Sequence, residues 1–210
     1  MVTLFGSTTL RVLKPLVVAE ELSIHYEQRH IDLVAGEHRQ PAYLAINAQG
    51  RIPVLEHEGR YLSESNAIAR YMADMTDNSL YPKDAWTRAE IEQWIAYFSY
   101  HVERNFVNVF FNRVAGPKLF GLKTDENLVN ECLATIQKEM PYIDSRLAEA
   151  DYLCGDTFTL ADVIAFCDIL GFEAAKIDLA AYQNFQRWYE SIKNRESVKK
   201  HTPKLLASPF

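Results

Sequence analysis

The chain has 210 residues, of which 48% are hydrophobic and 24% are charged, and its formal net charge at pH 7 is −6. This size and composition are ordinary for a globular protein with one large domain or two small ones. The acidic balance argues against nucleic acid and anionic membranes as main partners, because both are bound through clustered lysines and arginines. No run of about 18 apolar residues occurs, so no membrane span is expected.

Neither a secretory signal nor a disulfide framework is visible in the sequence. Residues 1–6 contain no basic segment and begin no long apolar run. The cysteines are Cys132, Cys154 and Cys167, and their odd number and wide spacing fit neither paired disulfides nor a zinc site. No Cys-x-x-Cys motif occurs, which excludes dithiol redox chemistry. We therefore expect buried structural thiols, no metal and a cytoplasmic location.

The N-terminal part of the chain predicts strands and helices in alternation. Residues 2–5 are a short apolar run typical of a buried strand, and residues 6–9 are a small polar loop. Apolar residues then recur at helical spacing from about Arg11. Pro15 is compatible with that helix if it falls in the first turn, where backbone amide donors are unpaired anyway. Residues 24–31 alternate weakly and predict a second strand.

The next stretch predicts a hairpin followed by a helix. Residues 32–47 are polar and predict only a short helix. Residues 54–57 and 60–63 flank Glu58-Gly59, which is a hairpin signal. In residues 65–75 the apolar side chains are spaced i, i+3, i+4 and i+7, which predicts an amphipathic helix.

The remaining chain predicts helices only. Residues 77–86 are a turn-rich linker without periodicity. Helices are predicted over about 86–115, 124–149 and 182–193, and another begins at Thr159, where Thr-x-x-Asp forms a capping box. An α/β part followed by a helical part predicts an α+β protein with two domains, residues 1–76 and residues 87–210.

Residues 50–72 combine features that suit a small anionic peptide. Pro53 opens a strand: it can be an ordinary trans edge proline, or the Ile52–Pro53 bond can be cis, which leaves the backbone groups of Ile52 free to pair with a bound peptide. Ser65 stands at the predicted N-cap of a helix, and its simplest role is that of a cap. The same helix end attracts a carboxylate, and Glu64 beside it can bind an ammonium group. Together they suit an amino-acid head group.

These residues, the segment Gly6–Val12 and the capping box at Thr159 resemble the cytosolic glutathione transferases, of the serine-type, theta-like or bacterial class. The resemblance extends over nearly the whole chain. It implies a thioredoxin-like, glutathione-binding N-terminal domain with the order βαβαββα, including a cis Ile52–Pro53 bond. It also implies an all-helical C-terminal domain that lines the pocket for a hydrophobic electrophile, and a homodimer.

The resemblance assigns residues to the glutathione site as well. The implied ligands are His38, Arg51, Ile52, Pro53, Glu64 and Ser65. Within this set, His38 and Arg51 match the positions that bind the glycyl carboxylate of glutathione. Arg51 departs from the commoner Lys or Gln but keeps a hydrogen-bonding head group.

The reacting thiol needs a separate donor. The thiolate is the nucleophile, and a free thiol with a pKa of about 8.5 is only a few per cent ionised at pH 7. In the family, a hydroxyl after the first strand stabilises the thiolate. Ser7 matches the serine of the pattern Gly-Ser-x-x-x-Arg and Arg11 matches its arginine, while Thr8 and Thr9 are alternative donors. Hydroxyl residues before a helix can also serve only as caps.

We therefore predict a glutathione S-transferase that conjugates the glutathione thiolate to electrophilic apolar small molecules. Glutathione-dependent peroxidase or dehalogenase activity would use the same site. A non-catalytic binding or scaffold protein on the same fold stays open, because a fold can outlast its catalysis. The intact segments Arg51-Ile52-Pro53 and Glu64-Ser65 favour the enzyme, whereas the unusual Ser7-Thr8-Thr9 loop keeps the scaffold alternative open.

Overall fold

The computed structural model describes residues 1–202 and divides into two compact units. The first unit comprises Met1–Tyr81 together with the described residues from Arg195 onward, and the second comprises Pro82–Asn194. The domain boundaries expected from the sequence, residues 1–76 and 87–210 joined by a linker at 77–86, stay a prediction. Residues 203–210 of that predicted helical domain lie outside the described part.

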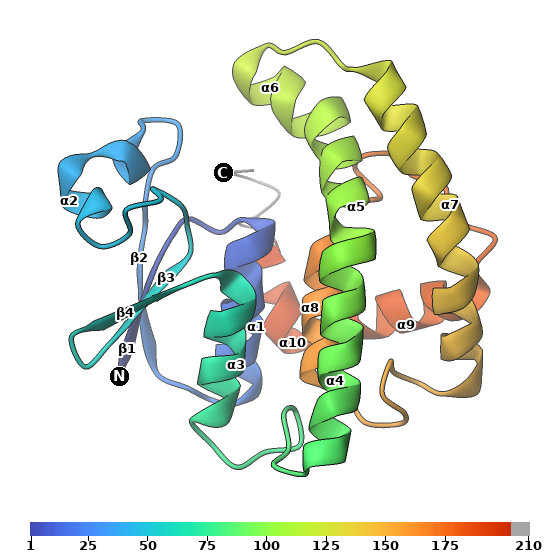
Figure 1. Cartoon of the computed structure of the whole chain (residues 1–210), viewed down its shortest axis with the longest axis horizontal. Coiled ribbons are helices and arrows are strands. Elements are labelled where there is room, and N and C mark those ends of the chain that lie inside the picture. Colours follow the sequence, from blue (N-terminus) through green and yellow to red (C-terminus); the bar gives the residue numbers. More distant parts are fainter. Residues whose placement is uncertain (203–210) are drawn as a thin grey trace. The chain divides into compact units, whose positions relative to one another are not determined.

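The first unit is built on a four-stranded sheet (Figure 1). Its strands are β1 (Val2–Phe5), β2 (Tyr26–Arg29), β3 (Val54–His57) and β4 (Arg60–Ser63), in the order β2-β1-β3-β4. Strand β1 runs parallel to β2 and antiparallel to β3, and β3 and β4 form a hairpin. Both central residues of the hairpin turn have positive φ, 54° at Glu58 and 75° at Gly59, as a type I′ turn requires.

Helical segments lie on both sides of this sheet (Figure 1). Helices α1 (Leu10–Glu21) and α3 (Ser65–Asp74) pack against each other on one side. On the other side are η1 (Glu37–Arg39) and α2 (Pro41–Leu44), where Phe5, Tyr43 and Val54 form a buried cluster. The short helix α10 (Glu196–Lys199) packs on α1. The predicted α+β class and the order βαβαββα are confirmed.

Two local predictions in this unit are wrong by a few residues. Helix α1 begins at Leu10 with Thr9 as its N-cap, so Pro15 lies in the second turn and not in the first. The helix tolerates the missing hydrogen bond because most of its side chains are buried, and tertiary packing outweighs intrinsic helix propensity. Ser65 is the first residue of α3, and the N-cap is Glu64. The single residue Glu64 separates β4 from α3, so it must make the turn between them.

The second unit is helical throughout its described elements. They are α4 (Ala85–Tyr97), η2 (Phe98–Val102), α5 (Glu103–Phe110), η3 (Phe111–Ala115), α6 (Gly116–Phe120), α7 (Glu126–Glu149), α8 (Leu160–Ile169) and α9 (Gln183–Lys193). The helix predicted over 86–115 continues to Phe120, with two turns of π-helix inside it, η2 and η3. Helix α8 begins at the predicted cap, where the N–H and the hydroxyl of Thr159 both donate to the buried Asp162 carboxylate. None of the helices in residues 1–202 is both long and apolar enough to cross a membrane.

Candidate active site

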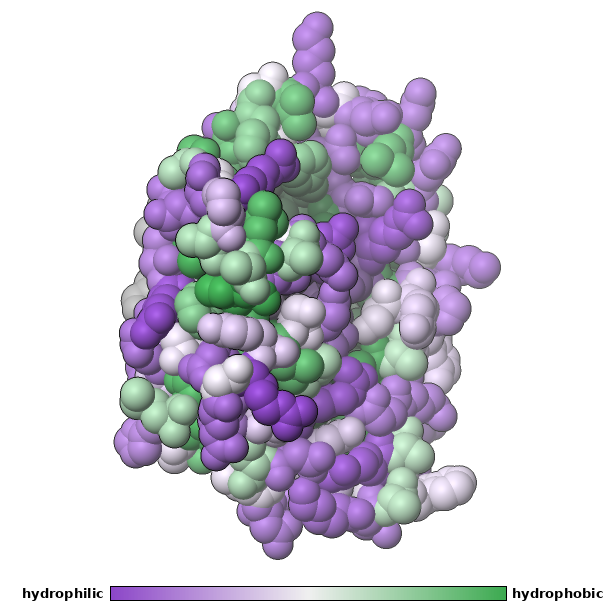
Figure 2. All heavy atoms as spheres, turned by 60° about the vertical axis from the view of Figure 1, so that its left-hand side comes forward, coloured by the Kyte–Doolittle hydropathy of each residue, from purple (hydrophilic) through white to green (hydrophobic). Residues whose placement is uncertain are grey.

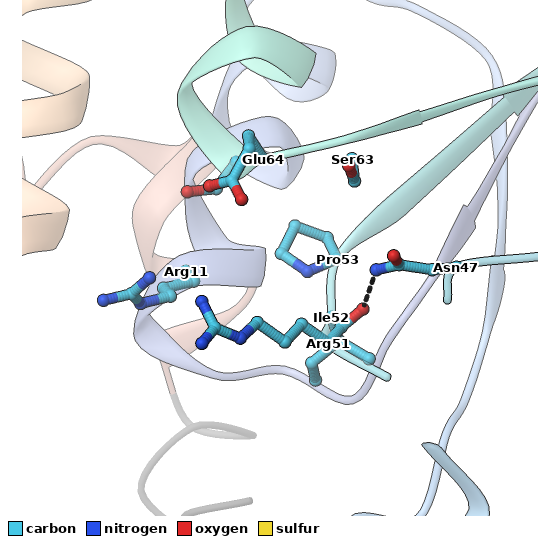
Figure 3. A pocket seen from close by; sticks show the side chains of 8 residues that line it. Arg11, Asn47, Arg51, Ile52, Pro53, Ser63 and Glu64 are labelled. Carbon is cyan, nitrogen blue, oxygen red and sulfur yellow. Dashed lines mark hydrogen bonds between the residues drawn. The ribbon is translucent and has the colours of Figure 1, made fainter. Parts of the chain in front are cut away.

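A small pocket in the first unit is lined by residues from three stretches of chain (Figure 3). The lining residues are Arg11, Asn47, Arg51, Ile52, Pro53, Ser63, Glu64 and Ser65. They come from the first turn of α1, the segment between α2 and β3, and the junction of β4 with α3. The sheet register explains why these stretches meet. The last residue of β1 pairs with the first residue of β3, which pairs in turn with the last residue of β4.

The pocket presents two positive charges and one negative charge. Arg11, Arg51 and Glu64 are the charged members of its lining. In Figure 3 the Arg51 side chain extends toward Arg11, and the guanidinium groups of both and the Glu64 carboxylate lie on the same side of Pro53. Arg51 and Glu64 are both exposed, so a ligand entering the pocket can reach their charged groups.

The backbone before β3 faces the pocket at Ile52. The Ile52–Pro53 peptide bond is cis, which confirms that prediction, and Pro53 is buried. The backbone N–H and C=O of Ile52 form no hydrogen bond within the described chain. Because Ile52 lines the pocket, an extended peptide bound there can pair with these groups.

The N-terminal end of α3 also reaches the pocket. Glu64 has φ 72° and ψ 113°, in a backbone region that residues other than glycine seldom occupy and that is found at ligand sites. Its side chain makes no capping hydrogen bond, so the carboxylate is not used by the helix. The first helical hydrogen bond runs from the Ile68 N–H to the Glu64 carbonyl, and the Ser65 and Ala67 N–H groups have no partner within the described chain, so they can bind an anion.

The three candidate thiol donors differ in their hydrogen bonding. None of Ser7, Thr8 and Thr9 is among the residues lining the pocket. The Thr9 hydroxyl accepts from the Val12 N–H at 3.4 Å, and the Thr8 hydroxyl lies 3.5 Å from the Gln28 side-chain amide. The Ser7 hydroxyl is buried and has no hydrogen-bond partner among the described residues. The Thr8 and Thr9 hydroxyls act as acceptors in these bonds, so of the three only the Ser7 oxygen makes no hydrogen bond within the described residues.

Close packing holds the Ser7 loop against Ile52. Gly6 has φ 151°, and a Cβ atom at this position would lie 2.9 Å from Val12 Cγ2 and 3.3 Å from Ile52 Cβ. Only glycine allows this approach. The Gln28 side-chain amide donates to the Gly6 carbonyl at 2.9 Å, which anchors the loop from the neighbouring strand.

His38 is not brought into the pocket lining. It lies in η1, where its Nε2 atom accepts from Arg39 Nε at 3.2 Å and its Nδ1 atom is buried without a partner among residues 1–202. The His38 backbone carbonyl instead packs closely against Gly50, because a Cβ atom at Gly50 would lie 2.8 Å from the carbonyl oxygen. Gly50 also has φ 60°, so the turn before Arg51 requires glycine.

Comparison with known proteins settles the family. The family model described as "Glutathione S-transferase, N-terminal domain" matches residues 1–74, and "Glutathione S-transferase, C-terminal domain" matches residues 92–196. A rice protein (Oryza sativa subsp. japonica) named "Probable glutathione S-transferase GSTF2" is 30% identical over 201 residues, which are 94% of each chain. The chain belongs to the glutathione S-transferase family. The prediction of this family is confirmed.

Solved structures of other glutathione transferases agree with the fold of this one. Glutathione transferase F2 from Populus trichocarpa superimposes with a TM-score of 0.91 at 26% identity, covering 99% of this chain and 100% of that one. Glutathione S-transferase I from maize, solved in complex with an atrazine glutathione conjugate, gives a TM-score of 0.90 at 27% identity, with 99% of both chains covered. The predicted fold and the prediction of a transferase are confirmed.

Three lining residues of this transferase, Arg11, Asn47 and Ser63, are absent from the ligands expected from the sequence. Arg11 had a signal, because it completes the pattern Gly-Ser-x-x-x-Arg. Asn47 had a weaker one: an asparagine before Gly50 indicates a turn, but a turn alone does not place a side chain in a pocket. In residues 1–202 no group of three His, Cys, Asp or Glu side chains is arranged to hold a metal ion.

Proposed function

We propose that this transferase binds glutathione in the pocket and uses Ser7 to stabilise its thiolate, which then attacks electrophilic apolar small molecules. The observation that carries the proposal is charge complementarity. Glutathione has two carboxylates and one ammonium group, and the pocket offers the Arg51 guanidinium and the positive N-terminal end of α3 for the carboxylates and the Glu64 carboxylate for the ammonium group. Each ligand charge therefore has a counterpart of opposite sign, which supports recognition of this tripeptide over neutral thiols.

Each part of glutathione is assigned a partner. The γ-glutamyl ammonium group binds Glu64, and its α-carboxylate binds the open amides at the start of α3 beside Ser65. The cysteinyl backbone pairs with Ile52, next to Pro53. The glycyl carboxylate binds Arg51. His38 is left out of this assignment because its imidazole contacts Arg39 and does not line the pocket.

Ser7 is the proposed thiol activator because it matches the serine of the pattern Gly-Ser-x-x-x-Arg and its hydroxyl has no hydrogen-bond partner among residues 1–202. Lowering a thiol pKa by about 2 units takes about 2.7 kcal/mol. One hydrogen bond to a charged acceptor contributes about 1.5–3 kcal/mol, so a single hydroxyl suffices. The thiolate sulfur then forms a bond to the electrophilic carbon, and the leaving group departs with the bonding electron pair. This chemistry uses no metal.

The second substrate and the assembly are proposed by analogy with the family. The helical unit is proposed to supply the electrophile pocket, and two copies to form a homodimer in the cytoplasm. In Figure 2 hydrophobic side chains interrupt a mainly hydrophilic surface. Light scattering after size exclusion tests the dimer, and the mass of a single chain would contradict it.

Retention on immobilised glutathione, followed by ultraviolet titration of the bound thiol, tests the proposal. We expect retention, elution by free glutathione and a thiol pKa below that of glutathione in solution. Absence of retention contradicts the binding site. Retention with an unshifted thiol pKa contradicts the enzyme and favours the non-catalytic binding protein. Turnover of peroxides or alkyl halides alone would favour the related glutathione-dependent activities.

A further inference from the structure

We propose that Tyr43 and Asn47 are positioning residues for glutathione: by holding the Arg51 carbonyl on the side away from Arg11 and Glu64, they turn the Ile52 N–H toward those charged groups of the pocket. This inference rests on the proposed function, since it explains how one of the assigned binding groups is oriented. Neither Tyr43 nor Asn47 need touch the reacting atoms.

Two buried side chains converge on one backbone oxygen. The Tyr43 hydroxyl donates to the Arg51 carbonyl at 2.8 Å, and the Asn47 side-chain amide donates to the same oxygen at 2.8 Å. Tyr43 is 4% exposed and Asn47 is 9% exposed. The two bonds occupy both lone pairs of the carbonyl oxygen, and Figure 3 shows Asn47 approaching it from the side away from Arg11 and Glu64.

Peptide geometry links the direction of the Arg51 carbonyl to the direction of the Ile52 N–H. The Arg51–Ile52 peptide is trans, because the cis bond of the described chain follows Ile52. A trans peptide is planar, so its C=O and N–H point in opposite directions. A carbonyl fixed toward Tyr43 and Asn47 therefore directs the Ile52 N–H away from them. Ile52 lines the pocket and its N–H has no partner within the described chain, so the free donor faces the ligand space.

Tyr43 and Asn47 are themselves held in place by other contacts. Asn47 closes the turn before Arg51 twice: its side-chain oxygen accepts from the Gln49 N–H at 3.1 Å, and its carbonyl accepts from the Gly50 N–H at 2.8 Å. Tyr43 packs in the cluster with Phe5 and Val54, and its backbone carbonyl accepts from the Asn47 N–H at 2.9 Å. Burial raises the pKa of Tyr43 to about 12, so its hydroxyl stays a donor at neutral pH.

Two conservative variants test the role. Tyr43→Phe removes one hydroxyl and keeps the ring in its cluster. Asn47→Asp keeps the oxygen that accepts from Gln49 but replaces the donor to Arg51 with a second oxygen, which repels the carbonyl. We expect the Kd for glutathione, measured by calorimetry, to rise about fivefold in Tyr43→Phe, as for one neutral hydrogen bond, and more in Asn47→Asp. The Ile52 amide, which glutathione protects from hydrogen exchange in the wild type, should lose that protection in part.

Tyr26→Phe is the matched control. The Tyr26 hydroxyl donates to Glu20 at 2.8 Å in the same unit, outside the pocket lining. A purely structural role for Tyr43 would lower the thermal midpoint as Tyr26→Phe does and leave the Kd unchanged, and that result overturns the inference. Wild-type protein that fails to bind glutathione overturns the proposed function and this inference together. If Asn47→Asp does not fold, the Kd of Tyr43→Phe decides alone.

Discussion

Replacing Ser7 with alanine should separate catalysis from stability in this protein. The Ser7 hydroxyl is buried and has no hydrogen-bond partner among residues 1–202. Its removal therefore breaks no internal hydrogen bond and relieves the burial of an unpaired polar group. We expect the free energy of unfolding of Ser7→Ala to equal that of the wild type or to exceed it by up to about 1 kcal/mol.

The activity of Ser7→Ala should fall in spite of this unchanged stability. A hydrogen bond to a charged acceptor contributes about 1.5–3 kcal/mol, and one pKa unit corresponds to about 1.36 kcal/mol. The pKa of bound glutathione should therefore rise by about 1–2 units. If the wild-type pKa lies about 2 units below 8.5, the thiolate fraction at pH 7, and kcat/KM with it, should drop about 3-fold for a rise of 1 unit and about 25-fold for a rise of 2 units.

The assay is a pH profile of kcat/KM combined with urea unfolding, and Thr9→Val provides a matched variant with the opposite expectation. Because the Thr9 hydroxyl caps α1 by accepting from Val12, its loss should cost about 0.5–1 kcal/mol of stability and leave the thiol pKa unchanged. A wild-type thiol pKa in Ser7→Ala would refute the reasoning. So would a raised thiol pKa in Thr9→Val, which would place the donor at Thr9, two residues further along the loop.

Three further predictions concern charge and burial. Arg51→Ala should weaken glutathione binding about tenfold. The affinity for γ-glutamylcysteine, which lacks the glycyl carboxylate, should stay unchanged in calorimetry, and equal losses for both ligands would contradict the assignment of Arg51 to that carboxylate. Asp162→Ala leaves three N–H donors of the second unit without their acceptor. Urea unfolding should therefore show a free energy of unfolding about 3–6 kcal/mol below that of the wild type, and a decrease below about 1 kcal/mol would contradict this role of Asp162. Burial alone raises the pKa of Glu21, but hydrogen bonds from Arg195 and Ser197 outweigh it and lower the pKa overall. A carboxylate whose pKa is lowered in the folded state stabilises the fold at pH values above its unfolded-state pKa, and this stabilisation is lost as pH falls toward the folded-state pKa. Arg195→Gln should therefore be less stable than the wild type near neutral pH, and the two stabilities should converge in acid.

Much of the fold follows from local patterns. Residues 54–57 and 60–63 were predicted as strands and are β3 and β4 with the same bounds, because Glu58-Gly59 accepts the positive φ values of a tight turn. The cap at Thr159 was predicted because it needs only residues three positions apart. These features depend on neighbours in sequence, so the sequence alone decides them. Pro15 and Ser65 were misplaced because one turn of helix, or one residue at its start, depends on packing against the rest of the unit.

The working parts of the site were decided by tertiary structure. Which hydroxyl after β1 lacks a partner depends on Gln28 of the neighbouring strand and on the cap of α1, and hydrogen-bond satisfaction of this kind has no local signature. The sheet order places Arg11 beside Arg51, and the fold of α2 places Tyr43 on the Arg51 carbonyl. The sequence by itself determined the family, the strands and the tripeptide segment around Pro53. Only the three-dimensional arrangement decided which charges face each other and which backbone group is held toward the ligand, because those depend on contacts between segments far apart in the chain.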